Sequence, residues 1–223
     1  EIDAREAPRR PLEARAAGRR GGRPEGSELS EEQAAAIASV ERAVEVVAGP
    51  QRGMLESSHR PQKVTVEDRR SGVSIVLRDQ KPMPEGRIGA ALIDGTTPSE
   101  WYQLINNKVF FWADEHRLLG LLKARAYRSL EHDVLTVNTR TLLAAHAQHV
   151  WLCHMNSGNT FPVGHKRGVD VFKRISDYPC KPSGDSLKRI VELVVDGKVS
   201  DIESHVISVR RMKGDVVLKT ILA

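Results

Sequence analysis

The sequence predicts an α+β fold in which a mixed, partly antiparallel sheet is flanked by helices. Two observations lead to this fold class. Helix-like patterns crowd the first two-thirds of the chain and strand-like runs the last third, without the strict alternation of a doubly wound α/β fold. No glycine-rich loop follows a strand-like run, so neither a P-loop nor a Rossmann fingerprint is present.

Local signals in the first half of the chain predict helices separated by short strands. Ser30 opens a capping box, and aliphatic residues follow at helical spacing until Gly49-Pro50, which predicts a helix over 30–48. The Thr97-Pro98 pair supplies an N-cap and a first helical residue for a second long helix. The remaining elements expected here are a helix over 51–58, strands over 63–66 and 73–77 around a turn at 69–72, and a weak helix over 86–94.

Strands dominate the second half. A strand is expected at Lys108–Trp112, and Asp114 then caps a leucine-rich helix. The elements that follow are strands over 133–137, 150–152, 169–175 and 190–195, helices over 140–147 and 200–204, and a closing hairpin of 205–209 with 216–218.

The bulk composition indicates a globular protein with one main domain. The 223 residues are 40% hydrophobic and 28% charged, a balance typical of globular chains. Residues 1–28 are rich in arginine and poor in large aliphatic residues, so we expect a disordered tail followed by a single domain over 29–223. The net charge of +5 is compatible with nucleotide phosphates or nucleic acid as partners.

The same composition points to the cytoplasm and away from membranes. No apolar run reaches the roughly 18–20 residues of a membrane span, and no signal segment is recognisable. Two cysteines do not make a disulfide framework. Because the chain starts with Glu1 rather than Met, we expect a truncated or processed N-terminus in which residues 1–48 need not be native. The sequence predicts no particular oligomeric state.

Glu192 stands out because it interrupts the most strand-like run of the chain. A period of two places Glu192 on one face with Ile190 and Val194, and Leu193 and Val195 on the other. An ionised carboxylate is costly to bury without a partner. Glu192 therefore either lies on a half-exposed strand face or is held in place for chemistry, and the pattern alone favours neither.

Two other kinds of site are weaker. His146, His149, Cys153 and His154 lie close together in the sequence and are ligand types that zinc accepts, but they show neither Cys-x-x-Cys nor His-Glu-x-x-His spacing. We therefore predict no metal at this cluster. Cys153 beside a histidine is compatible with a thiol enzyme, although a cysteine following a strand is more often a core residue.

An anion site is a further candidate. It would combine Arg78 and Gln80, at the end of a strand, with the loop Asn156-Ser157-Gly158-Asn159 and with Arg167. Arginine grips phosphate with two donors at once. The plainer alternative, an exposed Arg78–Asp79 pair of little energetic value, is favoured by the residues alone.

Several segments resemble known proteins. A bacterial family catalogued as a domain of unknown function is resembled over roughly residues 50–210, in the segments Arg78–Met83, Trp101–Trp112, Lys123–Tyr127, His132–Val137 and Met155–Gly158. The order of segments is also similar to that of DarT-type ADP-ribosyltransferases, with Arg78 after an early strand, then the aromatic run Val109–Trp112, then Glu192-Leu-Val-Val195 followed by Val199–Ile202.

The second resemblance implies an NAD-dependent ADP-ribosyltransferase-like protein with a split sheet. Glu192 would be the catalytic acid/base and Arg78 would contact the NAD phosphates. In the NAD site predicted from these residues together, Trp112 would stack on a ring of NAD, and Gln80, Asn156 and Ser157 of the candidate anion site would supply further contacts. The short Tyr-His strand with which such proteins begin is not found before residue 50. A non-catalytic nucleotide- or nucleic-acid-binding module is therefore the alternative prediction.

Overall fold

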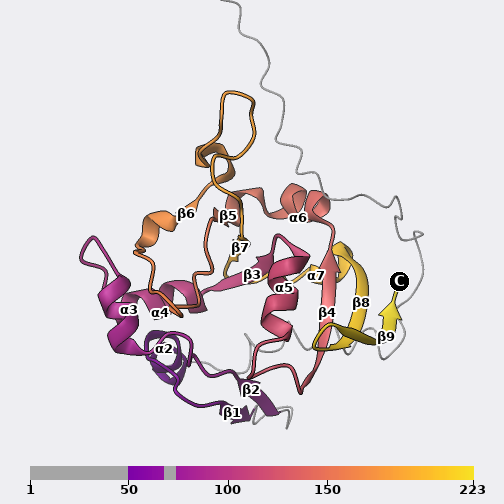
Figure 1. Cartoon of the computed structure of the whole chain (residues 1–223), viewed down its shortest axis with the longest axis horizontal. Coiled ribbons are helices and arrows are strands. Elements are labelled where there is room, and N and C mark those ends of the chain that lie inside the picture. Colours follow the sequence, from indigo (N-terminus) through magenta and orange to yellow (C-terminus); the bar gives the residue numbers. More distant parts are fainter. Residues whose placement is uncertain (1–49, 68–73) are drawn as a thin grey trace, which may run out of the picture.

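The computed structural model describes residues 50–67 and 74–223, which form six α-helices and three antiparallel sheets (Figure 1). The α+β prediction is confirmed. The expected tail at 1–28, the helix at 30–48 and the turn at 69–72 lie outside the described residues. The elements, in chain order, are α2 (Pro50–Ser57), β1 (Val64–Glu67), β2 (Ser74–Leu77), α3 (Glu85–Ala91), α4 (Pro98–Asn106), β3 (Lys108–Trp112), α5 (Glu115–Leu122), β4 (Glu131–Val137), α6 (Thr139–His146), β5 (Val150–Cys153), β6 (Phe172–Lys173), β7 (Glu192–Asp196), α7 (Ile202–His205), β8 (Val206–Lys213) and β9 (Val216–Leu222).

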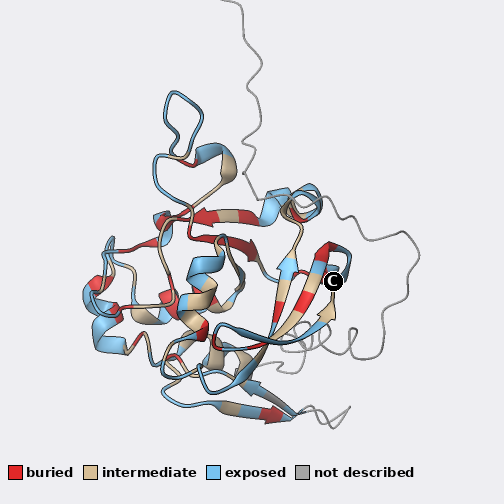
Figure 2. Cartoon of the chain, turned by 45° about the vertical axis from the view of Figure 1, so that its right-hand side comes forward, coloured by how far each residue is buried: buried red, intermediate tan, exposed pale blue. Residues whose placement is uncertain are grey.

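A four-stranded sheet with the order β3-β7-β5-β6 forms the centre of the molecule. Its strands are antiparallel, and β7 lies between β3 and β5. Because β7 is paired on both sides and carries aliphatic residues on both faces, nearly all of it is buried. Figure 2 shows this concentration of buried residues on the central strands.

A second, three-stranded sheet with the order β4-β8-β9 lies beside the first. Gly214 has a φ of +57° in the turn between β8 and β9, a backbone conformation that glycine adopts without steric cost. The predicted hairpin is confirmed, and its strands are longer than expected. Strands β1 and β2 form a separate two-stranded sheet.

The hydrophobic core has two main parts, one on each face of the central sheet. Leu193 and Val195 of β7 pack toward the three-stranded sheet, in a cluster that includes Val209 of β8. Val194 points to the opposite face and packs in a cluster that contains Ile88 of α3 and Trp101 of α4. The period-two pattern of the sequence thus sorts the side chains of β7 between the two clusters.

Local capping signals fix the helix beginnings as predicted. Thr97 Oγ1 accepts a hydrogen bond from the Glu100 N–H, and the Glu100 carboxylate accepts one from the Thr97 N–H, which completes a capping box at α4. The Asp114 side chain accepts from the His116 N–H at the start of α5.

Two expectations about strands are wrong. Residues 169–175 form only the two-residue strand β6, flanked by 3₁₀ turns at Val169–Val171 and Ile175–Asp177. Its partner β5 offers only Leu152 and Cys153 for pairing. Ile190 precedes β7 and packs against the cluster of Leu193 and Val195, so it does not share the face of Glu192. In the described part of the chain, no helix is long and apolar enough to cross a membrane.

Candidate active site

Glu192 is the first residue of β7 and lies at one end of the central strand. Its partners in register are Trp112 on β3 and Cys153 on β5. Directly opposite residues of an antiparallel pair point to the same face, with Cβ atoms roughly 5 Å apart. Glu192 therefore has an indole on one side and a thiol on the other. Only 4% of Glu192 is exposed, which excludes the half-exposed strand face.

The loop after β5 holds the carboxylate. Both carboxylate oxygens accept the Ser157 N–H, at 3.2 and 3.3 Å. The Ser157 hydroxyl is also buried and makes no hydrogen bond within the described residues. Gly158 N–H donates to Asn156 Oδ1, a local turn that shapes this loop. The sequence-predicted residues Trp112, Asn156, Ser157 and Glu192 are thus brought together.

The buried side chain of Arg167 binds the backbone of the same loop. Only 1% of it is exposed, and its guanidinium donates to the carbonyl oxygens of His165, Ser157 and Asn159 at 2.9–3.0 Å. A planar group with five donors suits this set of carbonyls. The loop is further attached through Thr160, whose N–H and hydroxyl both donate to Pro82 O.

The environment of Glu192 shifts the pKa of its carboxyl group toward neutrality. Burial raises the pKa of Glu192 to about 7, although the adjacent N–H and hydroxyl of Ser157 and the charge of Arg167 partly lower it. A group with a pKa near neutrality can both accept and release a proton at physiological pH. Burial also raises the pKa of Cys153, to about 12. Cys153 therefore stays a thiol, which argues against the thiol-enzyme alternative.

Arg78 and Gln80 are engaged elsewhere. The Arg78 guanidinium lies 3.9 Å from the ring centroid of Tyr127, a cation–π arrangement. Gln80 is buried; its Oε1 accepts the Arg60 N–H and its Nε2 donates to Asn106 Oδ1. These bonds tie the end of β2 to α4, so the Gln80 amide has a structural role.

Sequence reasoning missed a second polar cluster. In the described part of the chain, His146 lies together with Asp201 and His205. The sequence analysis had instead grouped His146 with His149, Cys153 and His154. The i, i+4 spacing of Asp201 and His205 is a signal in the sequence for half of this cluster. The other half depends on a contact across 55 residues.

One family model matches the chain. It is described as a family of unknown function, DUF7002, and it covers residues 27–206. The chain belongs to the DUF7002 family. No curated protein and no solved structure matches it. The DUF7002 match includes Glu192, Ser157 and Arg167, and it extends further toward the N-terminus than the predicted resemblance over 50–210.

Proposed function

We propose that this DUF7002 protein is an ADP-ribosyltransferase-like enzyme that uses NAD as substrate and Glu192 as its acid/base. The observation that carries the proposal is the buried Glu192 carboxyl, whose pKa is raised to about 7 by its burial. Perturbed carboxyls of this kind cluster at functional sites. The choice of reaction is supported by the order of segments along the sequence, in which Arg78, the aromatic strand β3 and the late Glu192 follow one another as in DarT-type ADP-ribosyltransferases.

The chemistry requires one negative charge and one proton acceptor. The bond between ribose C1′ and nicotinamide breaks, and the electron pair leaves with nicotinamide. Positive charge develops on the ribose, where the Glu192 carboxylate would stabilise it. A nucleophilic group of the acceptor then forms the new bond at C1′ and transfers its proton to Glu192.

The surroundings of Glu192 offer contacts for such a substrate. The Ser157 hydroxyl is a buried polar group without a hydrogen-bond partner in the described structure, and buried polar groups are normally paired. Trp112 lies beside Glu192 in the sheet and is half-buried, and an indole can stack on a ring of NAD. Because Glu192 itself is covered, the loop Asn156–Asn159 must shift before a substrate reaches it.

Nicotinamide release from NAD tests the proposal. The full chain is incubated with NAD, with and without candidate protein and nucleic-acid acceptors, beside Glu192→Gln. Glutamine keeps a hydrogen-bond acceptor for Ser157 but cannot exchange the proton, so the rate should fall about 10²–10⁴-fold. Glu131→Gln, an exposed position on β4, is the matched control and should keep the wild-type rate. Equal rates for wild type and Glu192→Gln would sink the catalytic proposal.

Net charge favours a second candidate, a nucleotide- or nucleic-acid-binding module without catalysis. The chain carries 34 basic and 29 acidic residues, and binding through phosphates weakens as salt rises. Titration with NAD and with DNA at two salt concentrations separates the candidates. Salt-sensitive binding without nicotinamide release supports the module, whereas binding with release supports the enzyme.

A further inference from the structure

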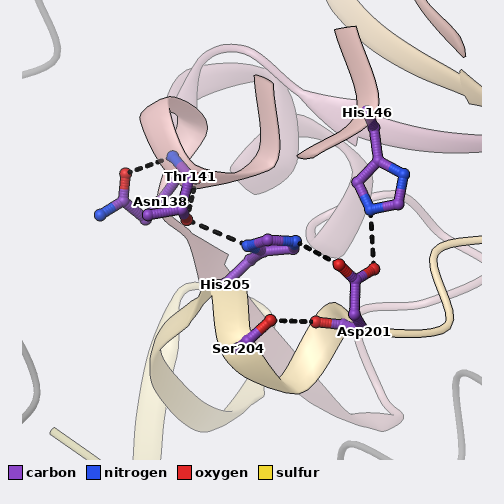
Figure 3. A network of polar contacts seen from close by, with 6 residues as sticks. All are labelled: Asn138, Thr141, His146, Asp201, Ser204 and His205. Carbon is purple, nitrogen blue, oxygen red and sulfur yellow. Dashed lines mark hydrogen bonds and ion pairs between the residues drawn. The ribbon is translucent and has the colours of Figure 1, made fainter. Parts of the chain in front are cut away.

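Three side chains converge where α6 meets α7. His146 is the last residue of α6, Asp201 immediately precedes α7, and His205 ends α7. The two oxygens of Asp201 face one imidazole each, with His146 Nε2 at 2.7 Å and His205 Nε2 at 3.1 Å (Figure 3). One ligand atom from each of the three residues lies within 4.8 Å of the other two.

Thr141 supports the imidazole of His205 from the side opposite Asp201. Its hydroxyl lies 3.0 Å from His205 Nδ1 and donates a hydrogen bond to Asn138 O at 3.2 Å. His205 Nε2 is thereby directed toward the Asp201 carboxylate. In the tautomer whose proton is on Nδ1, Nε2 carries a lone pair that can bind a metal ion.

The arrangement matches the requirements of a zinc ion. Imidazole nitrogens and a carboxylate oxygen bind zinc at about 2.0–2.2 Å, which places tetrahedral ligand atoms about 3.3 Å apart. The two imidazole nitrogens already lie 2.7 and 3.1 Å from oxygens of Asp201, close to this spacing. A ligand histidine normally donates its other N–H to an oxygen that fixes the ring, and Thr141 has this position behind His205.

The surroundings favour a preformed site with an open entrance. His205 is only 5% exposed, whereas 46% of the Asp201 side chain is exposed, so an ion has a path from solvent to the carboxylate. Asn138 N–H donates to His205 O at 2.7 Å and thereby joins the start of α6 to the end of α7. Leu142 and Ile202 pack in one core cluster and hold the two helices together.

We propose that His146, Asp201 and His205 bind a divalent transition-metal ion, with zinc as the best match to two nitrogen ligands and one oxygen ligand. The ion ties α6 to α7 and leaves a fourth coordination position open to water. This site is separate from Glu192 and does not depend on the proposed transferase activity.

Metal binding by the untagged full chain is the test. Zinc uptake is measured by calorimetry after chelator treatment, and Co²⁺ is used as a spectroscopic substitute. We expect one ion per chain at saturation, visible Co²⁺ absorption of a nitrogen- and oxygen-ligated site without thiolate charge transfer, and an increase in Tm with zinc. Mg²⁺ should have no effect, because it prefers sites made of oxygen ligands.

Variants distinguish the cluster from adventitious binding. His146→Ala and Asp201→Asn remove partly exposed ligands and should abolish the saturable uptake with the fold retained by circular dichroism. Thr141→Val removes only the group behind His205 and should weaken binding about 10–100-fold. His149→Ala, an exposed histidine of the same segment, is the matched control. The proposal fails if the wild type shows no saturable uptake, or if His149→Ala reduces it as much as His146→Ala does.

Discussion

Replacing Arg167 with methionine should strongly destabilise the fold. Methionine keeps the aliphatic bulk but removes all three hydrogen bonds to the loop that holds Glu192. A hydrogen bond to a charged group contributes about 1.5–3 kcal/mol, and a buried carbonyl left unpaired costs about 1–3 kcal/mol. Ser157 is buried, whereas Asn159 and His165 have access to water. Counting the Ser157 bond fully and the other two at about 1 kcal/mol each gives a loss of about 3–5 kcal/mol.

Urea denaturation measures this loss. With a slope of about 2 kcal/mol/M, the midpoint should fall by about 2 M. Arg167→Lys keeps the charge without the planar fork of donors, so it should lie between wild type and Arg167→Met. Lys166→Met is the matched control: Lys166 is exposed and, among the described residues, its ammonium donates to Ala90 O alone, so the loss of stability should stay within about 0.5–1 kcal/mol. A loss below about 1 kcal/mol in Arg167→Met would refute the role assigned to the buried guanidinium.

Three further predictions concern pH, capping and backbone conformation. The folded-state pKa of Glu192 is raised from 4.5 to about 7, so between these pH values the carboxyl is protonated in the folded state and ionised in the unfolded state. The free energy of unfolding therefore falls as the pH rises from about 4.5 to 7. The loss, on the order of 3 kcal/mol, should disappear in Glu192→Gln when urea midpoints are compared at pH 5 and pH 8. Thr97→Ala removes the cap of α4 and should cost about 1 kcal/mol in urea unfolding, whereas Ser99→Ala in the same turn should cost less. Gly214→Ala should cost about 1–2 kcal/mol because of the positive φ, whereas Gly120→Ala, within α5 and with no atom near its added Cβ, should raise the Tm.

Elements with short-range signals could be predicted from the sequence. The helix α4 begins at Pro98 because Thr97, Pro98 and Glu100 supply every group of its cap locally. The strand β7 could be predicted because a strand in the middle of a sheet is buried on both faces, and such burial requires the aliphatic run found in its sequence. The strand expected at 169–175 failed because pairing depends on the partner, and β5 provides only two partner residues there.

The candidate site was only partly predictable for the same physical reason. The burial of Glu192 follows from the order of strands in the sheet, with β3 and β5 on either side, and no local pattern specifies that order. Likewise, α6 supplies His146 and the residues around α7 supply the other two members of the polar cluster. Their convergence requires the packing of two segments that are far apart in sequence.

Arg167 shows how one residue can couple the stability of the fold to the state of Glu192. Its three acceptors are backbone carbonyls, which every residue type has. The sequence therefore gives no sign that Arg167 stabilises this loop, and only the folded structure shows it. The same loop carries the Ser157 N–H that the Glu192 carboxylate accepts. Any movement that exposes Glu192 to a substrate must therefore strain the bonds of Arg167 or carry Arg167 with it. Breaking the three hydrogen bonds together would cost several kcal/mol. The movement of lowest free-energy cost therefore keeps Arg167 bound to the loop and shifts Arg167 and the Ser157 segment as a unit.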